Sequence, residues 1–194
     1  MQPIEIDAKD GHIPGDDDAL WSFLIGDMIV FVMFFCIYAA HRAAAVELYR
    51  ASQATLHVAY GVGNTLLLLT SSLFVAGAAA AFRRRALGPC RQLLGWGVLC
   101  GLGFAIAKCL EYYGKAEAGI TPLSNEFFTF YYVFTGIHLV HLLVGVGVLG
   151  YGYVKLRVSG LEAMTLQEIE SGASYWHMVD LLWIVIFPLI YLLP

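Results

Sequence analysis

A small set of ionisable side chains interrupts the long apolar segments of this sequence, and these side chains limit the chemistry that it can perform. An ionisable group inside a lipid bilayer costs about 2.5 to 3.5 kcal/mol on insertion scales, so each one requires a partner or a function. Histidine and carboxylate groups can together bind a metal ion, relay a proton or form hydrogen bonds between helices. The candidates within the apolar segments are Asp27, Lys108, Glu111, His138, His141, His177 and Asp180.

The histidine and aspartate residues allow three interpretations. His138 and His141 share one helical face, and with His177 and the aspartates they could ligate a metal ion. We favour a hydrogen-bonded network that joins helices, because this spacing occurs on any polar helical face and no Glu-x-x-His motif is present. A proton relay through Asp27 is the third interpretation. We therefore assign no catalytic and no metal-binding residue to the chain.

Lys108 and Glu111 form a separate candidate pair. They are three residues apart, a spacing that places both side chains on one side of a helix. Near a helix end, the two groups can form an ion pair or extend toward the membrane interface. We expect this helix-end pair to lie at the opposite end of the molecule from the histidines.

The elements that must position these residues are membrane helices. The chain of 194 residues is 59% hydrophobic and only 13% charged, whereas soluble domains carry about 25% charged residues. A helix needs about 20 mostly apolar residues to cross a bilayer. The sequence therefore predicts an all-α, polytopic membrane bundle of about five transmembrane helices. The predicted spans are residues 20–38, 57–82, 93–112, 127–153 and 175–193.

The distribution of charge predicts the domain organisation and the orientation. Residues 1–19 form an acidic N-terminal tail, and residues 20–194 form a single transmembrane domain. Most basic residues fall on the same side of the predicted spans as the N-terminus, so the positive-inside rule places the N-terminus in the cytoplasm and the C-terminus outside. We expect Asp27 and the residues of the last two spans to form one polar layer in the cytoplasmic half. The orientation depends mainly on Arg83, Arg84, Arg85, Arg91, Lys155 and Arg157.

Local patterns predict several helix ends and one close packing site. Asn125 is placed to cap the fourth span. Thr165 and Glu168 have the spacing of a capping box, which predicts a short surface helix before the last span. Gly97 and Gly101 form a G-x-x-x-G pattern, which allows a second helix to approach closely.

Several segments resemble the motifs of cytochrome c oxidase subunit III, a family of accessory subunits in haem-copper respiratory complexes. They occur in the family's order, and the resemblance covers about residues 20–194. The short five-helix form, with Asp27 where the family has a glutamate, is most similar to the NorE-type proteins associated with nitric oxide reductase. The matching segments are residues 64–72 (N-T-x-x-L-x-x-S-S), Glu111–Tyr112, residues 136–145 (G-x-H-x-x-H-x-x-x-G) and residues 175–183 (W-H-x-V-D-x-x-W).

The resemblance implies a non-catalytic subunit that packs on a haem-copper catalytic subunit, beside other subunits of a respiratory electron transport complex. It implies a phospholipid in a cleft of this chain, with haem and metal only in the partner subunit. Asp27 matches the family's acidic position, whose role is linked to protons. The family's role for the other motif residues is structural and lipid-adjacent, and these are His138, His141, His177 and Asp180.

Two other classes of function remain open, a membrane metalloenzyme that uses the histidine and aspartate layer and a small proton channel or transporter. The composition gives no indication of a nucleic-acid partner. The expected location is a bacterial inner membrane. The sequence does not identify the catalytic partner, the lipid, or whether the complex reduces oxygen or nitric oxide.

Overall fold

The computed structural model describes residues 16–193, and this part of the chain is built from helices without a strand. Five of its helices are long and apolar enough to cross a membrane. The predicted all-α, polytopic membrane fold is therefore confirmed. The elements are α1 (Asp16–Ala44), α2 (Val46–Gln53), α3 (Val58–Arg83), α4 (Leu87–Glu117), α5 (Glu126–Ser159), the 3-10 turn η1 (Leu161–Ala163), α6 (Leu166–Phe187) and the π-helical turn η2 (Pro188–Leu192).

The helices extend beyond the apolar stretches that predict them. Residues 16–19 of the predicted tail belong to α1, and residues 1–15 lie outside the described residues. The Thr165–Glu168 capping box is present, but it begins α6 itself, so the prediction of a separate surface helix is wrong. Helix α6 continues from the cap into the apolar span because the intervening residues contain no proline and pack one face against the bundle. The side chain of Asn125 caps α5, as predicted.

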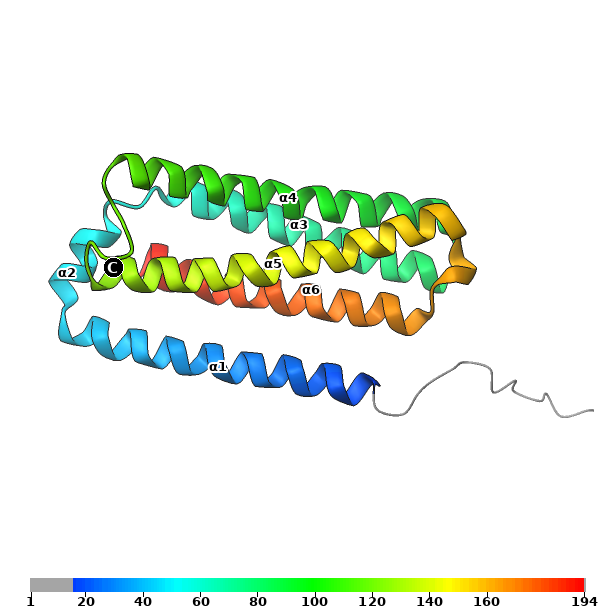
Figure 1. Ribbon diagram of the computed structural model, residues 1–194, viewed down its shortest axis with the longest axis horizontal. Helices are drawn as coiled ribbons and strands as arrows, with labels where there is room; N and C mark the ends of the chain where they lie inside the picture. The colour runs from blue at the N-terminus through cyan, green and yellow to red at the C-terminus, as the bar shows by residue number, and fades with distance from the viewer. Residues whose placement is uncertain (1–15, 194) are drawn as a thin grey trace, which may run out of the picture.

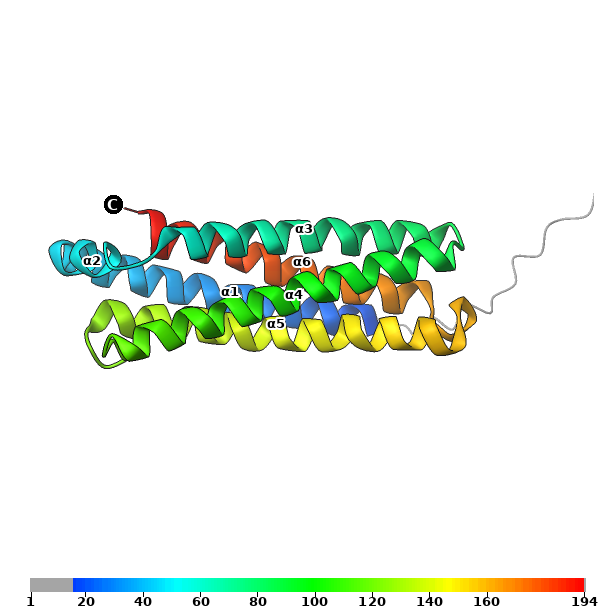
Figure 2. The ribbon, with the colours of Figure 1, turned by 90° about the horizontal axis from the view of Figure 1, so that it is seen from above.

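Helices α3, α4, α5 and α6 form a closed four-helix ring, and α1 lies outside it (Figures 1 and 2). Each helix of the ring packs on its neighbour in sequence, and α6 closes the ring by packing on α3. Helix α1 packs chiefly on α6. The consecutive spans α1 and α3 are thus not close neighbours, and α2 connects them at one end of the molecule.

The two ends of the bundle differ in composition. The N-terminal end, at the right of Figure 1, contains the start of α1 and the α3–α4 and α5–α6 connections. Ion pairs there join the basic connections to the start of α6, including Arg83 with Glu170 at 2.7 Å and Lys155 with Glu168 at 2.7 Å. The C-terminal end contains α2, the α4–α5 loop and η2.

Close packing within the ring depends on glycine. A Cβ atom on Gly97 would lie 3.0 Å from Cγ2 of Val75, and one on Gly101 would lie 2.7 Å from Cη2 of Trp176. Ser71 of α3 also donates a hydrogen bond to the carbonyl of Gly97 at 2.8 Å. The G-x-x-x-G pattern thus marks a packing site, as predicted, and it serves α3 and α6 from one helix.

Candidate functional site

The polar residues selected from the sequence lie near the middle of their helices. Because α6 begins at Leu166, His177 lies about 16 Å along its axis. His141 lies close to the midpoint of α5 and Asp27 close to that of α1. The helices begin and end farther from these residues than their apolar stretches suggest, so each of the three residues lies near the middle of its helix. The expected layer in the cytoplasmic half of the membrane stays a prediction.

Asp27 and His141 join α1 to α5. The Oδ1 atom of Asp27 lies 3.2 Å from Nε2 of His141, and both side chains are more than four-fifths buried. The ring of Phe31 packs edge-on against the imidazole. Tyr175 of α6 donates a hydrogen bond to the carbonyl of His141 at 3.2 Å, so three helices meet at this point.

The hydrogen bond of His141 to its own helix orients the imidazole toward Asp27. Nδ1 of His141 lies 2.8 Å from the carbonyl oxygen of Ile137, which can only accept, so Nδ1 carries a proton. Nε2 is thereby left to face the Asp27 carboxyl group across the two helices. The contact between Asp27 and His141 is therefore a polar link from α1 to α5.

His138 is not part of this pair. It is fully buried, and its Nε2 donates to the carbonyl oxygen of Val179 at 3.1 Å. The rings of Phe104 and Trp183 pack against the imidazole, with ring centroids 5.4 and 5.1 Å away. His138 thus connects α5 to the backbone of α6, the helix-joining role that we favour for the polar residues.

His177 and Asp180 form a third, separate group on α6. Nδ1 of His177 lies 2.6 Å from the hydroxyl of Ser72 on α3 and 4.0 Å from Oδ2 of Asp180. Both neighbours face the same ring nitrogen, so the three residues lack the arrangement of a hydrolase triad, which uses both nitrogens. Asp180 is buried, and neither of its oxygen atoms has a hydrogen-bond partner among the described residues.

The predicted polar layer is therefore divided into three local contacts. Within residues 16–193, no three histidine, cysteine or carboxylate side chains come together in a way that could hold a metal ion. The described geometry gives the metal-site interpretation no ligand set. It agrees better with separate helix-joining contacts.

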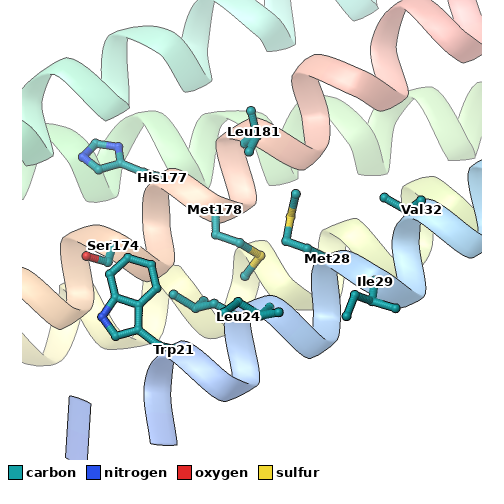
Figure 3. A pocket seen from close by; sticks show the side chains of 10 residues that line it. Trp21, Leu24, Met28, Ile29, Val32, Ser174, His177, Met178 and Leu181 are labelled. Atoms are coloured by element: carbon teal, nitrogen blue, oxygen red, sulfur yellow. The ribbon is translucent and has the colours of Figure 1, made fainter. Parts of the chain in front are cut away.

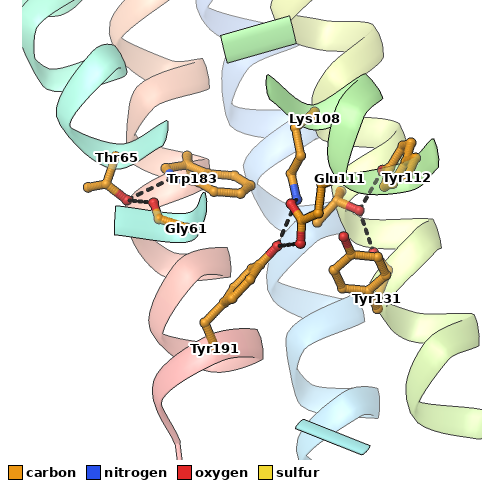
Figure 4. A network of polar contacts seen from close by, with 9 residues as sticks. Gly61, Thr65, Lys108, Glu111, Tyr112, Tyr131, Trp183 and Tyr191 are labelled. Atoms are coloured by element: carbon orange, nitrogen blue, oxygen red, sulfur yellow. Dashed lines mark hydrogen bonds and ion pairs between the residues drawn. The ribbon is translucent and has the colours of Figure 1, made fainter. Parts of the chain in front are cut away.

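The Lys108–Glu111 pair is present and buried, and it does not extend to the interface. Nζ of Lys108 lies 2.9 Å from Oε2 of Glu111, and the lysine side chain is fully buried. Tyr191 of η2 completes the group, because its hydroxyl accepts from Lys108 at 2.8 Å and donates to Oε1 of Glu111 at 2.7 Å (Figure 4). Aromatic rings surround the ammonium group at 5.1 to 5.7 Å from their centroids, and they belong to Tyr112, Tyr131, Trp183 and Tyr191.

An apolar groove lies between α1 and α6, and its position is the feature that the sequence did not predict. Its volume is about 590 Å³. The lining of the groove comes from α1 and from α6, and the imidazole of His177 at its edge points away from α1 (Figure 3). Sequence patterns gave no signal for it, because its residues are ordinary apolar residues on two distant helices. The lining includes Trp21, Leu24, Met28, Ile29, Met178 and Leu181.

Comparison with known proteins gives matches over nearly the whole chain. The sequence profile described as cytochrome c oxidase subunit III matches residues 17–193. Cytochrome c oxidase subunit 3 of Corynebacterium diphtheriae is 28% identical over 87% of this chain and 83% of the relative. Quinol oxidase subunit 3 of Bacillus subtilis is 26% identical over 98% of this chain and 92% of the relative. Heme-copper oxidase subunit I+III of Aeropyrum pernix is 29% identical over 90% of this chain, which corresponds to 22% of that longer protein.

Proposed function

Because this chain belongs to the cytochrome c oxidase subunit III family, we propose that it is a non-catalytic accessory subunit of a haem-copper respiratory complex. The family match over residues 17–193 is the observation that carries this proposal. The relatives include subunits of oxidases named for cytochrome c and for quinol. The electron donor, and the choice between oxygen and nitric oxide, are therefore properties of the catalytic partner.

We propose a one-to-one association with the catalytic subunit. The relative from Aeropyrum pernix is named subunit I+III, which describes both subunits in one polypeptide. A protein with such a composition contains one copy of each part, and this supports equal stoichiometry for the separate chains. Haem and copper belong to the partner in this proposal. We further propose a bacterial inner membrane, with the N-terminus in the cytoplasm, from the distribution of basic residues.

The groove between α1 and α6 is the proposed phospholipid site. It is lined almost entirely by apolar side chains and opens between two membrane helices, which is the setting of an acyl chain. Trp21, at the start of α1, lies at one end of the groove, where an indole ring can reach the headgroup region. The groove therefore fits a lipid tail along the direction of the helices.

The Asp27–His141 pair is proposed to stabilise the attachment of α1 to the ring. Helix α1 is the least buried of the spanning helices, so its few polar contacts matter for its attachment. Besides Asp27 with His141, they include Tyr38 with the Leu189 carbonyl and His41 with Glu126 of α5. If the pair stabilises the attachment of α1, its substitution should shorten the time for which the complex remains active during turnover. A contact that matters only for its immediate neighbours would leave this lifetime unchanged.

Affinity purification from native membranes in mild detergent tests the accessory-subunit proposal. The sample is analysed by mass spectrometry and by a reduced-minus-oxidised absorption spectrum. We expect haem bands and a catalytic subunit in a one-to-one ratio with this chain, and the partner then identifies the reaction. A haem-free protein without a partner would overturn the proposal. Metal analysis and proton flux in liposomes would then test the metalloenzyme and channel alternatives.

A further inference from the structure

The C-terminal turn η2 contacts three other helices at the C-terminal end of the bundle. Tyr38 of α1 donates a hydrogen bond to the carbonyl of Leu189 at 3.2 Å. Tyr191 reaches Lys108 and Glu111 on α4. On α3, a Cβ atom at Gly61 would lie 3.3 Å from Cδ1 of Tyr191 in the turn, and 2.5 Å from Cε2 of Phe187, the last residue of α6.

The geometry of η2 explains why this turn can make such contacts. Pro188 has no amide hydrogen to donate, and the chain continues from it as a π-helical turn closed by a hydrogen bond from Leu193 to the Pro188 carbonyl at 2.9 Å. Carbonyls in the last turn of a helix have no donor within the helix. Tyr38 supplies the donor for Leu189, so α1 satisfies a group that the end of α6 leaves open.

The Lys108–Glu111 pair gives the turn one defined position. A buried ion pair adds little net stability compared with apolar side chains of the same size, but its directional hydrogen bonds can specify a register. Tyr191 must place one oxygen atom to accept from Lys108 and donate to Glu111. Sliding the turn along α4 would break both bonds and leave two buried charges without this partner.

We propose that η2 is a clasp that fastens α1 and α4 to the end of α6, with the buried Lys108–Glu111 pair as the receptor for the Tyr191 hydroxyl. The C-terminal half of α1 is held at Tyr38 by this turn, beside the contacts of Tyr38 with Phe130 and Phe134 of α5. The N-terminal half of α1 lines the apolar groove (Figure 3). The clasp thus sets the position of α1 from the end of the bundle that lies away from the groove.

Hydrogen–deuterium exchange on the purified complex tests the clasp. The variant Tyr191→Phe keeps the ring and removes both hydrogen bonds, and Tyr113→Phe, an exposed tyrosine on α4, is the matched control. We expect Tyr191→Phe to accelerate exchange on the order of tenfold in residues 186–193 and 36–44, as loss of about one buried hydrogen bond per contact implies. The N-terminal half of α1 and the centre of α4 should retain their hydrogen-exchange rates.

Two further variants separate the clasp from general stability. Tyr38→Phe should accelerate exchange in residues 36–44, with a smaller effect on the turn. The double variant Lys108→Met with Glu111→Leu removes both charges together, so it should fold, yet show the fast exchange of Tyr191→Phe at residues 186–193. Exchange equal to that of Tyr113→Phe, or acceleration spread evenly over all helices, would overturn the proposal.

Discussion

The carboxyl group of Asp27 lies 3.2 Å from Nε2 of His141, and this contact joins the peripheral helix α1 to the four-helix ring near the middle of both helices. His141 is already bonded through Nδ1 to the carbonyl of Ile137. The two residues are 114 positions apart in the sequence, yet their side chains are in contact in the folded protein. This relationship makes the pair the most informative target for substitution.

We expect Asp27→Asn to assemble normally and to change mainly stability or the lifetime of the complex during turnover. The amide of asparagine can donate to a neutral Nε2, so the helix contact is retained. Asp27→Ala removes the partner of His141 and should lower the free energy of unfolding by about 1 to 3 kcal/mol. Thermal unfolding in detergent measures the difference, and Asp18→Asn, on the exposed start of α1, is the control.

Turnover assays of the same variants measure the lifetime of activity. A complete loss of assembled complex in Asp27→Asn would contradict the structural role and would indicate that the carboxyl group itself is required for association. Equal stability of Asp27→Ala and the unmodified protein would show that the pair does not hold α1.

The groove predicts a selective effect on bound lipid. Ile29 lines the groove and is 63% exposed, so Ile29→Trp should fill space that an acyl chain would occupy without disturbing the ring. We expect on the order of tenfold weaker phospholipid retention, equivalent to about 1.4 kcal/mol. Native mass spectrometry measures the retained lipid. Val30→Trp, the adjacent exposed position outside the groove, is the control, and equal retention in both variants would contradict the lipid site.

Two glycines that face Trp176 predict a packing test. A methyl group on Gly101 would lie 2.7 Å from the indole ring, and one on Gly145 would lie 2.8 Å from it. Alanine at either position should destabilise the fold by about 1 to 3 kcal/mol. Gly147→Ala, which meets no atom within 4 Å, should be neutral in the same thermal unfolding assay. Recovery of stability when Trp176→Phe is combined with Gly101→Ala would confirm the indole as the cause.

We expect the position of Asp180 to tolerate substitution by asparagine. Neither carboxyl oxygen has a hydrogen-bond partner among the described residues, so Asp180→Asn removes the ionisable group without breaking a described hydrogen bond. We expect unchanged or slightly raised thermal stability of the isolated chain. Co-purification with the catalytic subunit is measured in parallel. Loss of the partner at unchanged chain stability would place Asp180 in the association between subunits instead.

The sequence by itself determined the class of fold and the ends of several helices. Long apolar stretches predict spanning helices because an isolated helix satisfies its own backbone hydrogen bonds in lipid. Asn125 and the Thr165–Glu168 box cap helices through local bonds that need only neighbouring residues. The order of the family motifs also identified the family, which the match over residues 17–193 confirms.

Only the tertiary structure decided which polar residues meet. Spacing placed His138 and His141 on one face, yet His138 bonds to the backbone of α6 while His141 contacts Asp27 of α1. The Lys108–Glu111 pair was visible locally, but its third member, Tyr191, comes from a distant turn. Such contacts depend on the rotation of each helix and on the choice of α6 as the neighbour of α1. These are set by packing over the whole bundle, which no local pattern encodes.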